Sequence, residues 1–332
     1  RSLRNPALAD MYQRTLDEAE ATGTDRKKQI AAARQIWKTG FVAEAIDTFS
    51  CKTKHLDITG QKNGGLITGD DLAGWSATYE DPTSSVFCGK TICKTAPWGQ
   101  GPVLLQGLAL AQAKGISNIE PDSAQFYHTL IEVMKLTYAD RETFYGDPKF
   151  IDVPLSTLLS DRYNEERAKL ISGVADLTWR PGDISGFGYQ VDYDAASNIE
   201  IDEAALIAAG IGEPTSKGQA SEAVAGIVNG DTCHINVVDK WGNMVSATPS
   251  GGWMESSPII PELGVCLGTR LQMMRLNPEA PDFLLPNKRP RTTLTPTLVL
   301  NEDGSPYLAC GTPGGDKQDQ WQLAFLIRHL MY

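Results

Sequence analysis

Apolar residues recur every three or four positions in the first half of the chain and alternate with polar residues in the second. The clearest helical stretch is DSAQFYHTLIEVMKLTYADRETFYGDP, in which Phe126, Leu130, Met134 and Tyr138 are spaced four residues apart. This spacing places all four side chains on one face of an α-helix. The turn-forming residues 146–148, Gly-Asp-Pro, follow the pattern and end it. We therefore predict one long helix that buries this face.

Helix-start and helix-stop signals predict further helices on either side. Thr68 is followed three residues later by Asp71, a capping-box pattern that opens a short helix. Asn5-Pro6 opens a longer helical region, and Gly40 interrupts it. The other helices predicted from apolar spacing cover residues 5–50, 103–112 and 159–171.

Strand patterns are concentrated in the second half of the chain. HINVV and MVSAT flank a turn at residues 239–243, and TPTLVL and YLACG flank another at residues 301–305, which predicts two β-hairpins. Residues 85–95 form a weaker strand pair, and residues 180–228 show no periodicity. Because helices come first and a sheet follows, the pattern favours an α+β or layered α/β fold over a barrel.

Composition narrows the possible partners. The chain has 332 residues, of which 41% are hydrophobic and 21% charged, as in ordinary globular proteins. Its formal net charge is -11, and because phosphate contacts require Lys and Arg, nucleic acid is not an expected partner. No run of about 18 apolar residues is present, so no membrane span is expected. The chain begins with Arg1 and ends at Tyr332 inside an apolar helical run, so we expect an internal piece of a longer protein.

Cysteine and histidine patterns do not indicate a metal or cofactor site. The six cysteines form no CxxC pair, so we interpret them as buried thiols rather than as zinc ligands or a disulfide framework. The four histidines form no HExxH motif, and the GxSxG elbow of α/β-hydrolases is absent. We therefore expect neither a metal nor a cofactor.

Two loop motifs could take part in chemistry. In CGTPGGDKQDQ a predicted strand leads through Gly314-Gly315 into a predicted helix, and successive backbone N–H groups there can form an anion-binding nest. The motif lacks the GK[ST] ending of a Walker loop. In NKRPRTTLTPT, Thr292 and Thr293 follow three basic residues. Taken alone, a plain strand-to-helix turn and a solvated strand start are the favoured interpretations of these motifs.

Five motifs in one order resemble those of the γ-glutamyltransferase family of N-terminal nucleophile hydrolases. They are KNGGLITGDDLA, YADRETFYGDPKF, DTCHINVVDKWGNMVSAT, NKRPRTTLTPTLVL and GTPGGDKQ, and together they span most of the chain. The resemblance implies a four-layer αββα sandwich of the α+β class and a precursor that cleaves itself between Asp231 and Thr232. Residues 1–231 would form the C-terminal part of a large subunit and residues 232–332 the N-terminal part of a small subunit. The two would make one domain and a processed heterodimer.

The resemblance also assigns catalytic roles. Thr232 becomes the nucleophile at a new N-terminus, and its freed α-amino group, with a pKa of roughly 7.7–8.0, can accept the hydroxyl proton. Ser250 stands where the family has a threonine whose hydroxyl supports the nucleophile. The backbone N–H groups of Gly314 and Gly315 would stabilise the oxyanion of the tetrahedral intermediate.

The substrate-binding positions depart from the family's pattern. Thr292 and Thr293 replace a serine pair that touches the substrate, and they keep the hydroxyl groups. Gly252 replaces an asparagine, while Arg270 and Met273 stand near the positions of a glutamine and an aspartate that hold the substrate's α-amino group. Because arginine pairs with carboxylates and repels ammonium groups, an acyl group with a carboxylate and no amine would suit Arg270 better.

The sequence therefore predicts a self-processing amide hydrolase or acyltransferase. It would take a small-molecule γ-glutamyl or related acyl amide, form an acyl-enzyme on Thr232, and pass the acyl group to water or an amine. One alternative is a strict γ-glutamyltransferase that acts on glutathione. A second alternative is a non-catalytic or unprocessed relative, and the retained hydroxyl groups and glycines weigh against it. A third is a generic α+β binding domain without catalysis, and it differs from the enzyme because only a self-processing protein yields two chains from one gene.

Overall fold

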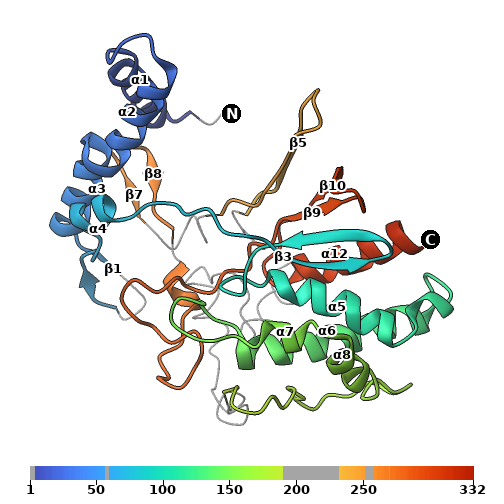
Figure 1. Ribbon diagram of the computed structural model, residues 1–332. Coiled ribbons are helices and arrows are strands. Elements are labelled where there is room, and N and C mark those ends of the chain that lie inside the picture. Colours follow the sequence, from blue (N-terminus) through green and yellow to red (C-terminus); the bar gives the residue numbers. More distant parts are fainter. Residues whose placement is uncertain (1–3, 57–59, 190–231, 251–257, 269) are drawn as a thin grey trace. The chain divides into compact units, whose positions relative to one another are not determined.

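The computed structural model describes most of the chain and divides it into two compact units. The described residues are 4–56, 60–189, 232–250, 258–268 and 270–332 (Figure 1). The first unit is Arg1–Glu80 with Met254–Gly268, and the second is Asp81–Trp253 with Thr269–Tyr332. Among the described residues, no helix is both long and apolar enough to cross a bilayer.

The first unit is mostly helical. The Asn5 side chain begins its first helix by accepting a hydrogen bond from the Leu8 N–H at 3.1 Å and donating to the Gly264 carbonyl at 2.7 Å. Thr68 and Asp71 form the predicted capping box. The elements are α1 (Pro6–Glu20), α2 (Arg26–Thr39), α3 (Phe41–Lys52), α4 (Gly69–Gly74) and two strand pairs, β1 (His55–Leu56) with β2 (Lys62–Asn63) and β7 (Ile259–Ile260) with β8 (Val265–Cys266).

The helical region at residues 5–50 contains one more break than the sequence predicted. Gly40 separates α2 from α3 as expected, and a Cβ atom there would lie only 2.8 Å from the Ile36 Cα. A second break precedes α2, where the Asp25 carboxylate accepts a hydrogen bond from the Lys27 N–H at 2.8 Å. The buried core of this unit consists of Met11, Ile36, Val42, Ala45, Ile46, Ile260 and Leu263.

The second unit contains a four-stranded antiparallel sheet with the order β10-β9-β4-β3. The strand pairs predicted at residues 85–95 and on either side of residues 301–305 are both confirmed. They also pair with each other, since Cys93 lies opposite Leu298. The expectation that the sheet follows the helices is therefore wrong for half of its strands, because this long-range pairing leaves no local signal. The strands are β3 (Thr83–Phe87), β4 (Lys90–Lys94), β9 (Thr297–Leu300) and β10 (Pro306–Cys310).

Helices pack on the sheet face that carries Ile92 and Val299, which lie opposite each other and are fully buried. Figure 1 shows α5 and α12 beside these strands. Leu104 and Leu108 of α5 and Leu323 of α12 complete this core. The four-layer arrangement of the αββα sandwich stays a prediction. The helices are α5 (Gly101–Ala113), η1 (Ile116–Asn118), α6 (Ala124–Phe144), α7 (Leu155–Leu158), α8 (Asp161–Ala168), η2 (Arg270–Met273) and α12 (Lys317–Met331).

A separate hairpin joins this unit beside β10. Its strands are β5 (Ile235–Val238) and β6 (Met244–Ala247), as predicted. Asp239 closes the turn by accepting hydrogen bonds from the N–H groups of Trp241 and Asn243 at 2.8 and 2.9 Å. Ser246 Oγ donates to the Cys310 carbonyl at 3.0 Å, which ties β6 to the end of β10.

The expectation of buried thiols is wrong. All six cysteines are free, and none is fully buried: Cys51, Cys88 and Cys233 are exposed and the other three are partly buried. Cys88 lies in the tight turn between β3 and β4, and Cys233 lies at the open end of the hairpin. Chain segments at such positions run over the surface, so the apolar character of the thiol does not decide its burial.

Candidate active site

The β5–β6 hairpin brings two of the predicted catalytic residues together. Its register continues beyond the strands, because the Cys233 N–H donates to the Pro249 carbonyl at 3.2 Å. This pairing places the hydroxyl groups of Thr232 and Ser250 within hydrogen-bonding distance, with 3.0 Å between Thr232 Oγ1 and Ser250 Oγ. Both residues are partly buried. Ser250 therefore presents its hydroxyl to the predicted nucleophile.

His234 links this hairpin to the loop after β10. Its Nδ1 lies 2.8 Å from Thr248 Oγ1 and its Nε2 lies 3.0 Å from Asn236 Oδ1. Because an amide oxygen only accepts, Nε2 donates to Asn236, while the Thr248 hydroxyl is the hydrogen-bond partner of Nδ1. The ring lies so close to the backbone of Gly311 that a Cβ atom there would be 2.2 Å from Cε1. The sequence predicted only a strand residue here, and this contact between distant segments has no local signature.

The predicted oxyanion residues form the turn that leads into α12. Gly314 and Gly315 have φ angles of +121° and +56°, in the region that favours glycine. Their carbonyl groups accept hydrogen bonds from the N–H groups of Lys317 at 2.9 Å and Gln318 at 3.2 Å. Within the described part of the chain, neither glycine N–H has an acceptor. Unpaired N–H donors at a helix start can bind an anionic oxygen, although Gly314 is only partly exposed and Gly315 is buried.

Thr292 and Thr293 lie in the interior, so the alternative of a solvated strand start is wrong. Their exposed fractions are 6% and 0%. Thr292 Oγ1 accepts a hydrogen bond from the Leu294 N–H at 3.2 Å. On its other side, a Cβ atom built on Gly99 would lie 3.4 Å from Thr292 Cγ2. The PWGQG turn at residues 97–101 therefore packs against this threonine.

Buried charges hold the start of α12. Asp319 accepts a hydrogen bond from Thr295 Oγ1 at 2.9 Å and lies 3.5 Å from Lys94 Nζ. Lys94 also donates to the Thr295 carbonyl at 2.8 Å and to Thr297 Oγ1 at 2.7 Å. Burial raises the pKa of Asp319 to about 6 and lowers the pKa of Lys94. This polar network fixes the first turn of α12 to β4 and β9.

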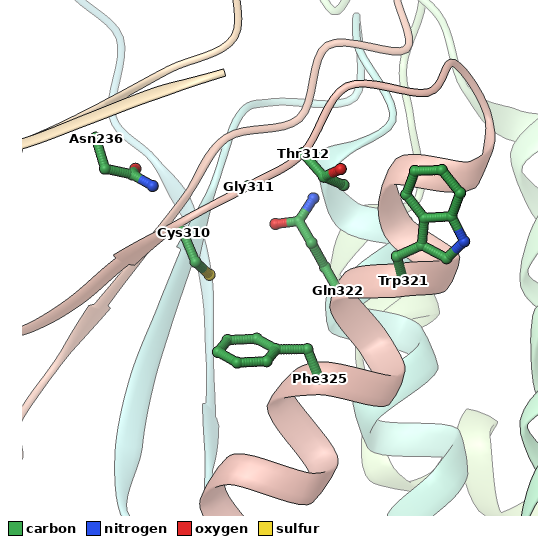
Figure 2. Close-up of a pocket in the computed structure, with 7 residues that line it drawn as sticks. All are labelled: Asn236, Cys310, Gly311, Thr312, Trp321, Gln322 and Phe325. Atoms are coloured by element: carbon green, nitrogen blue, oxygen red, sulfur yellow. The ribbon is translucent and has the colours of Figure 1, made fainter. Parts of the chain in front are cut away.

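A cavity of about 250 Å³ lies beside the Gly311 contact. Figure 2 shows Asn236 on one side, the end of β10 along the wall, and three side chains of α12 on the other. Trp321 from this wall also packs against Gly314, since a Cβ atom there would be 2.7 Å from its ring. The lining residues are Asn236, Cys310, Gly311, Thr312, Trp321, Gln322 and Phe325.

The remaining predicted site residues either lie in the short helix η2 or fall outside the described residues. Arg270 begins the short helix η2 and is partly buried, and Met273 ends the same helix and is 3% exposed. The substrate-binding role of Arg270 stays a prediction. Asp231 and Gly252 lie outside the described residues.

Known proteins similar to this chain fall into two groups by name. The "Glutathione hydrolase proenzyme" of Bacillus subtilis (strain 168) is 32% identical over 281 residues, which are 84% of this chain and 44% of that protein. The "Acylase ACY 1 proenzyme" of Pseudomonas sp. (strain SE83) is 27% identical over 254 residues, which are 76% of this chain and 38% of that protein. The chain thus spans less than half the length of these relatives.

Solved structures show the same mixed α/β fold. "LmbA2991HD" matches with a TM-score of 0.80 and 44% identity, over 98% of this chain and 51% of that one. The cephalosporin acylase from Bacillus halodurans matches with a TM-score of 0.61 and 21% identity, over 97% of this chain and 52% of that one. The sequence profile described as Gamma-glutamyltranspeptidase matches residues 2–332. The chain therefore belongs to the gamma-glutamyltranspeptidase family.

Proposed function

We propose that the protein is a self-processing amide hydrolase or acyltransferase with Thr232 as its nucleophile. The observation that carries the proposal is the hydroxyl pair of Thr232 and Ser250, 3.0 Å apart. A threonine hydroxyl is a weak nucleophile and requires a nearby base. Cleavage between Asp231 and Thr232 supplies that base, because the freed α-amino group titrates at roughly 7.7–8.0.

The acyl-transfer step uses these groups in order. The Thr232 hydroxyl oxygen attacks the amide carbonyl carbon while the α-amino group takes the hydroxyl proton. The N–H groups of Gly314 and Gly315 donate to the resulting oxyanion. The α-ammonium then protonates the leaving nitrogen, the C–N bond breaks, and an ester remains on Thr232. Water or an amine attacks this ester and regenerates the free hydroxyl.

The same proposal covers the subunits. Residues 1–231 belong to the large subunit and residues 232–332 to the small subunit, which together form the αββα domain. The word "proenzyme" in the names of the Bacillus and Pseudomonas relatives supports processing of this kind.

We further propose that the acyl group carries a carboxylate and no α-amine. Arg270 stands near the positions where the family's motif has a glutamine and an aspartate, and Gly252 replaces an asparagine. A cation cannot stabilise an ammonium group, whereas a guanidinium pairs with a carboxylate in a bidentate geometry. The name acylase, which one of the similar proteins carries, is in keeping with an acyl amide as the substrate.

Two anilides test the proposal. The complete natural gene product that contains this chain is assayed with glutaryl-p-nitroanilide and L-γ-glutamyl-p-nitroanilide, beside its Thr232→Ala and Arg270→Gln variants. We expect preferential hydrolysis of the glutaryl amide, no hydrolysis by Thr232→Ala, and a selective loss of glutaryl activity in Arg270→Gln. Comparable rates on both anilides would contradict the altered acyl specificity. Activity that survives in Thr232→Ala would contradict the nucleophile.

A further inference from the structure

Two adjacent residues near the end of α6 lie in the interior although both are charged. Arg141 is 1% exposed and Glu142 is 2% exposed. The guanidinium of Arg141 donates to both carboxylate oxygens of Asp316, at 2.8 and 3.3 Å, and to Gln100 Oε1 at 2.7 Å. It also pairs with Glu142 at 2.5 Å and lies 4.4 Å from the centre of the Tyr138 ring. Charged groups are buried in this way only when they are paired.

Glu142 extends the network to a second chain segment. Its carboxylate accepts a hydrogen bond from Arg291 at 3.1 Å and pairs with Arg275. Asp282 lies 3.7 Å from Arg291 and 3.6 Å from Arg275. Among the described residues, this largely buried network thus balances three guanidinium groups with three carboxylates, those of Glu142, Asp282 and Asp316.

Three contacts of this pair, those with Gln100, Asp316 and Arg291, reach residues next to the candidate site. Asp316 follows Gly315 directly, and its carbonyl also accepts a hydrogen bond from the Tyr138 hydroxyl. Arg291 directly precedes Thr292. Gln100 follows Gly99, the residue that packs against Thr292. Three separate segments are therefore held by one turn of α6.

The turn at Gly314 and Gly315 requires a contact that fixes its conformation. Gly314 and Gly315 have no side chains to fix their conformation, and glycine samples both signs of φ readily. An oxyanion donor acts only when its N–H points at the developing charge, and a displacement of about 1 Å can cost about 100-fold in rate. The bidentate pair between Arg141 and Asp316 fixes the residue that follows these donors.

We infer that Arg141 and Glu142 are positioning residues. They hold the turn at Gly314 and Gly315, and the segment that contains Thr292, in the geometry needed for acyl transfer. This inference rests on the proposed function, and it adds two positioning residues that were not among the predicted site residues. It differs from a purely stabilising network because it predicts a loss in kcat that exceeds the loss of folded protein.

Conservative substitutions in the complete gene product test the inference. Arg141→Lys keeps the charge but loses the planar fork, and Asp316→Asn keeps the size but loses the charge. The matched control is Arg167→Lys, because Arg167 is a buried arginine of α8 whose carboxylate partner is Asp140, at 3.0 Å. Each variant is assayed for kcat and KM on glutaryl-p-nitroanilide, and amide hydrogen exchange is followed in the peptide that covers residues 311–318.

We expect Arg141→Lys and Asp316→Asn to lower kcat by about 10- to 100-fold and to change KM by less than about threefold. Exchange in residues 311–318 should become faster in both variants and stay unchanged in Arg167→Lys. The inference is overturned if kcat and exchange match the parent protein, or if Arg167→Lys lowers kcat to the same extent. If the parent hydrolyses neither anilide, the proposed function fails, and hydrogen exchange alone tests the inference. Faster exchange in residues 311–318 of the two variants then supports the role of Arg141 in holding this turn, and unchanged exchange overturns it.

Discussion

Gly311→Ala should damage the candidate site through a single contact. A Cβ atom at this position would lie 2.2 Å from Cε1, 2.6 Å from Nδ1 and 2.7 Å from Nε2 of His234. Favourable contacts between carbon atoms are about 3.5–4.0 Å long, so the ring must move by more than about 1 Å. A movement of that size breaks its hydrogen bonds to Thr248 and Asn236, which are now 2.8 and 3.0 Å long.

The magnitude follows from these two effects. Overpacking costs about 1–3 kcal/mol, and two lost hydrogen bonds cost about 1–3 kcal/mol together. We therefore expect Gly311→Ala to lower the free energy of unfolding by about 2–6 kcal/mol. Urea unfolding measures this loss, in a Thr232→Ala background so that every variant is compared as one chain. Gly173→Ala is the control, because no atom lies within 4 Å of a Cβ built at Gly173.

A double variant separates the clash from other causes. With His234→Ala in place the ring is gone, so Gly311→Ala should then cost less than about 1 kcal/mol. The reasoning is refuted if Gly311→Ala is as stable as the Gly173→Ala control. It is also refuted if the cost of Gly311→Ala is the same with and without the histidine ring.

Three further predictions concern other residues of the candidate site. Burial raises the folded pKa of Asp319 to about 6 from an ordinary value of 3.8. Between these two pH values the folded protein keeps a proton that the unfolded chain has released, so the free energy of unfolding falls by about 3 kcal/mol as pH rises from about 4 to 6. Urea unfolding across this range should show a smaller fall in Asp319→Asn, and an equal fall would contradict the assignment. Ser250→Ala should lower kcat by about 2- to 10-fold, as expected for one neutral hydrogen bond, whereas Ser250→Thr should keep the rate. Gly314→Ala should lower kcat by about 100-fold or more, because φ is +121° and the new Cβ would lie 2.7 Å from Trp321; Gly304→Ala, with φ +79° and open space, is the control for backbone strain alone.

Local signals predicted the elements of the fold well, because the information lies within each segment. The capping box at Thr68 and the break at Gly40 are confirmed, and so are both hairpins of the second half. The pairing of β4 with β9 was missed because its partners are separated by about 200 residues, and register between distant strands is set by packing rather than by local pattern.

The site was predicted in part for the same reason. Thr232 and Ser250 are joined by a hairpin whose turn and alternation are visible in the sequence, so their proximity follows from local structure. The buried ion pair of Arg141 and Asp316 joins distant segments and has no such signature. One signal was available for its neighbour, since Glu142 continues the four-residue spacing of Phe126 to Tyr138 and thus falls on the buried face of α6.

The central claim is that Thr232 becomes an N-terminal nucleophile, and intact mass with N-terminal sequencing tests it most directly. The complete gene product and its Thr232→Ala variant are purified and incubated side by side. The account predicts that the native protein separates into two chains, that the smaller begins Thr-Cys-His, and that the variant stays whole. Two intact proteins after long incubation, or cleavage at the same bond in the variant, would contradict it.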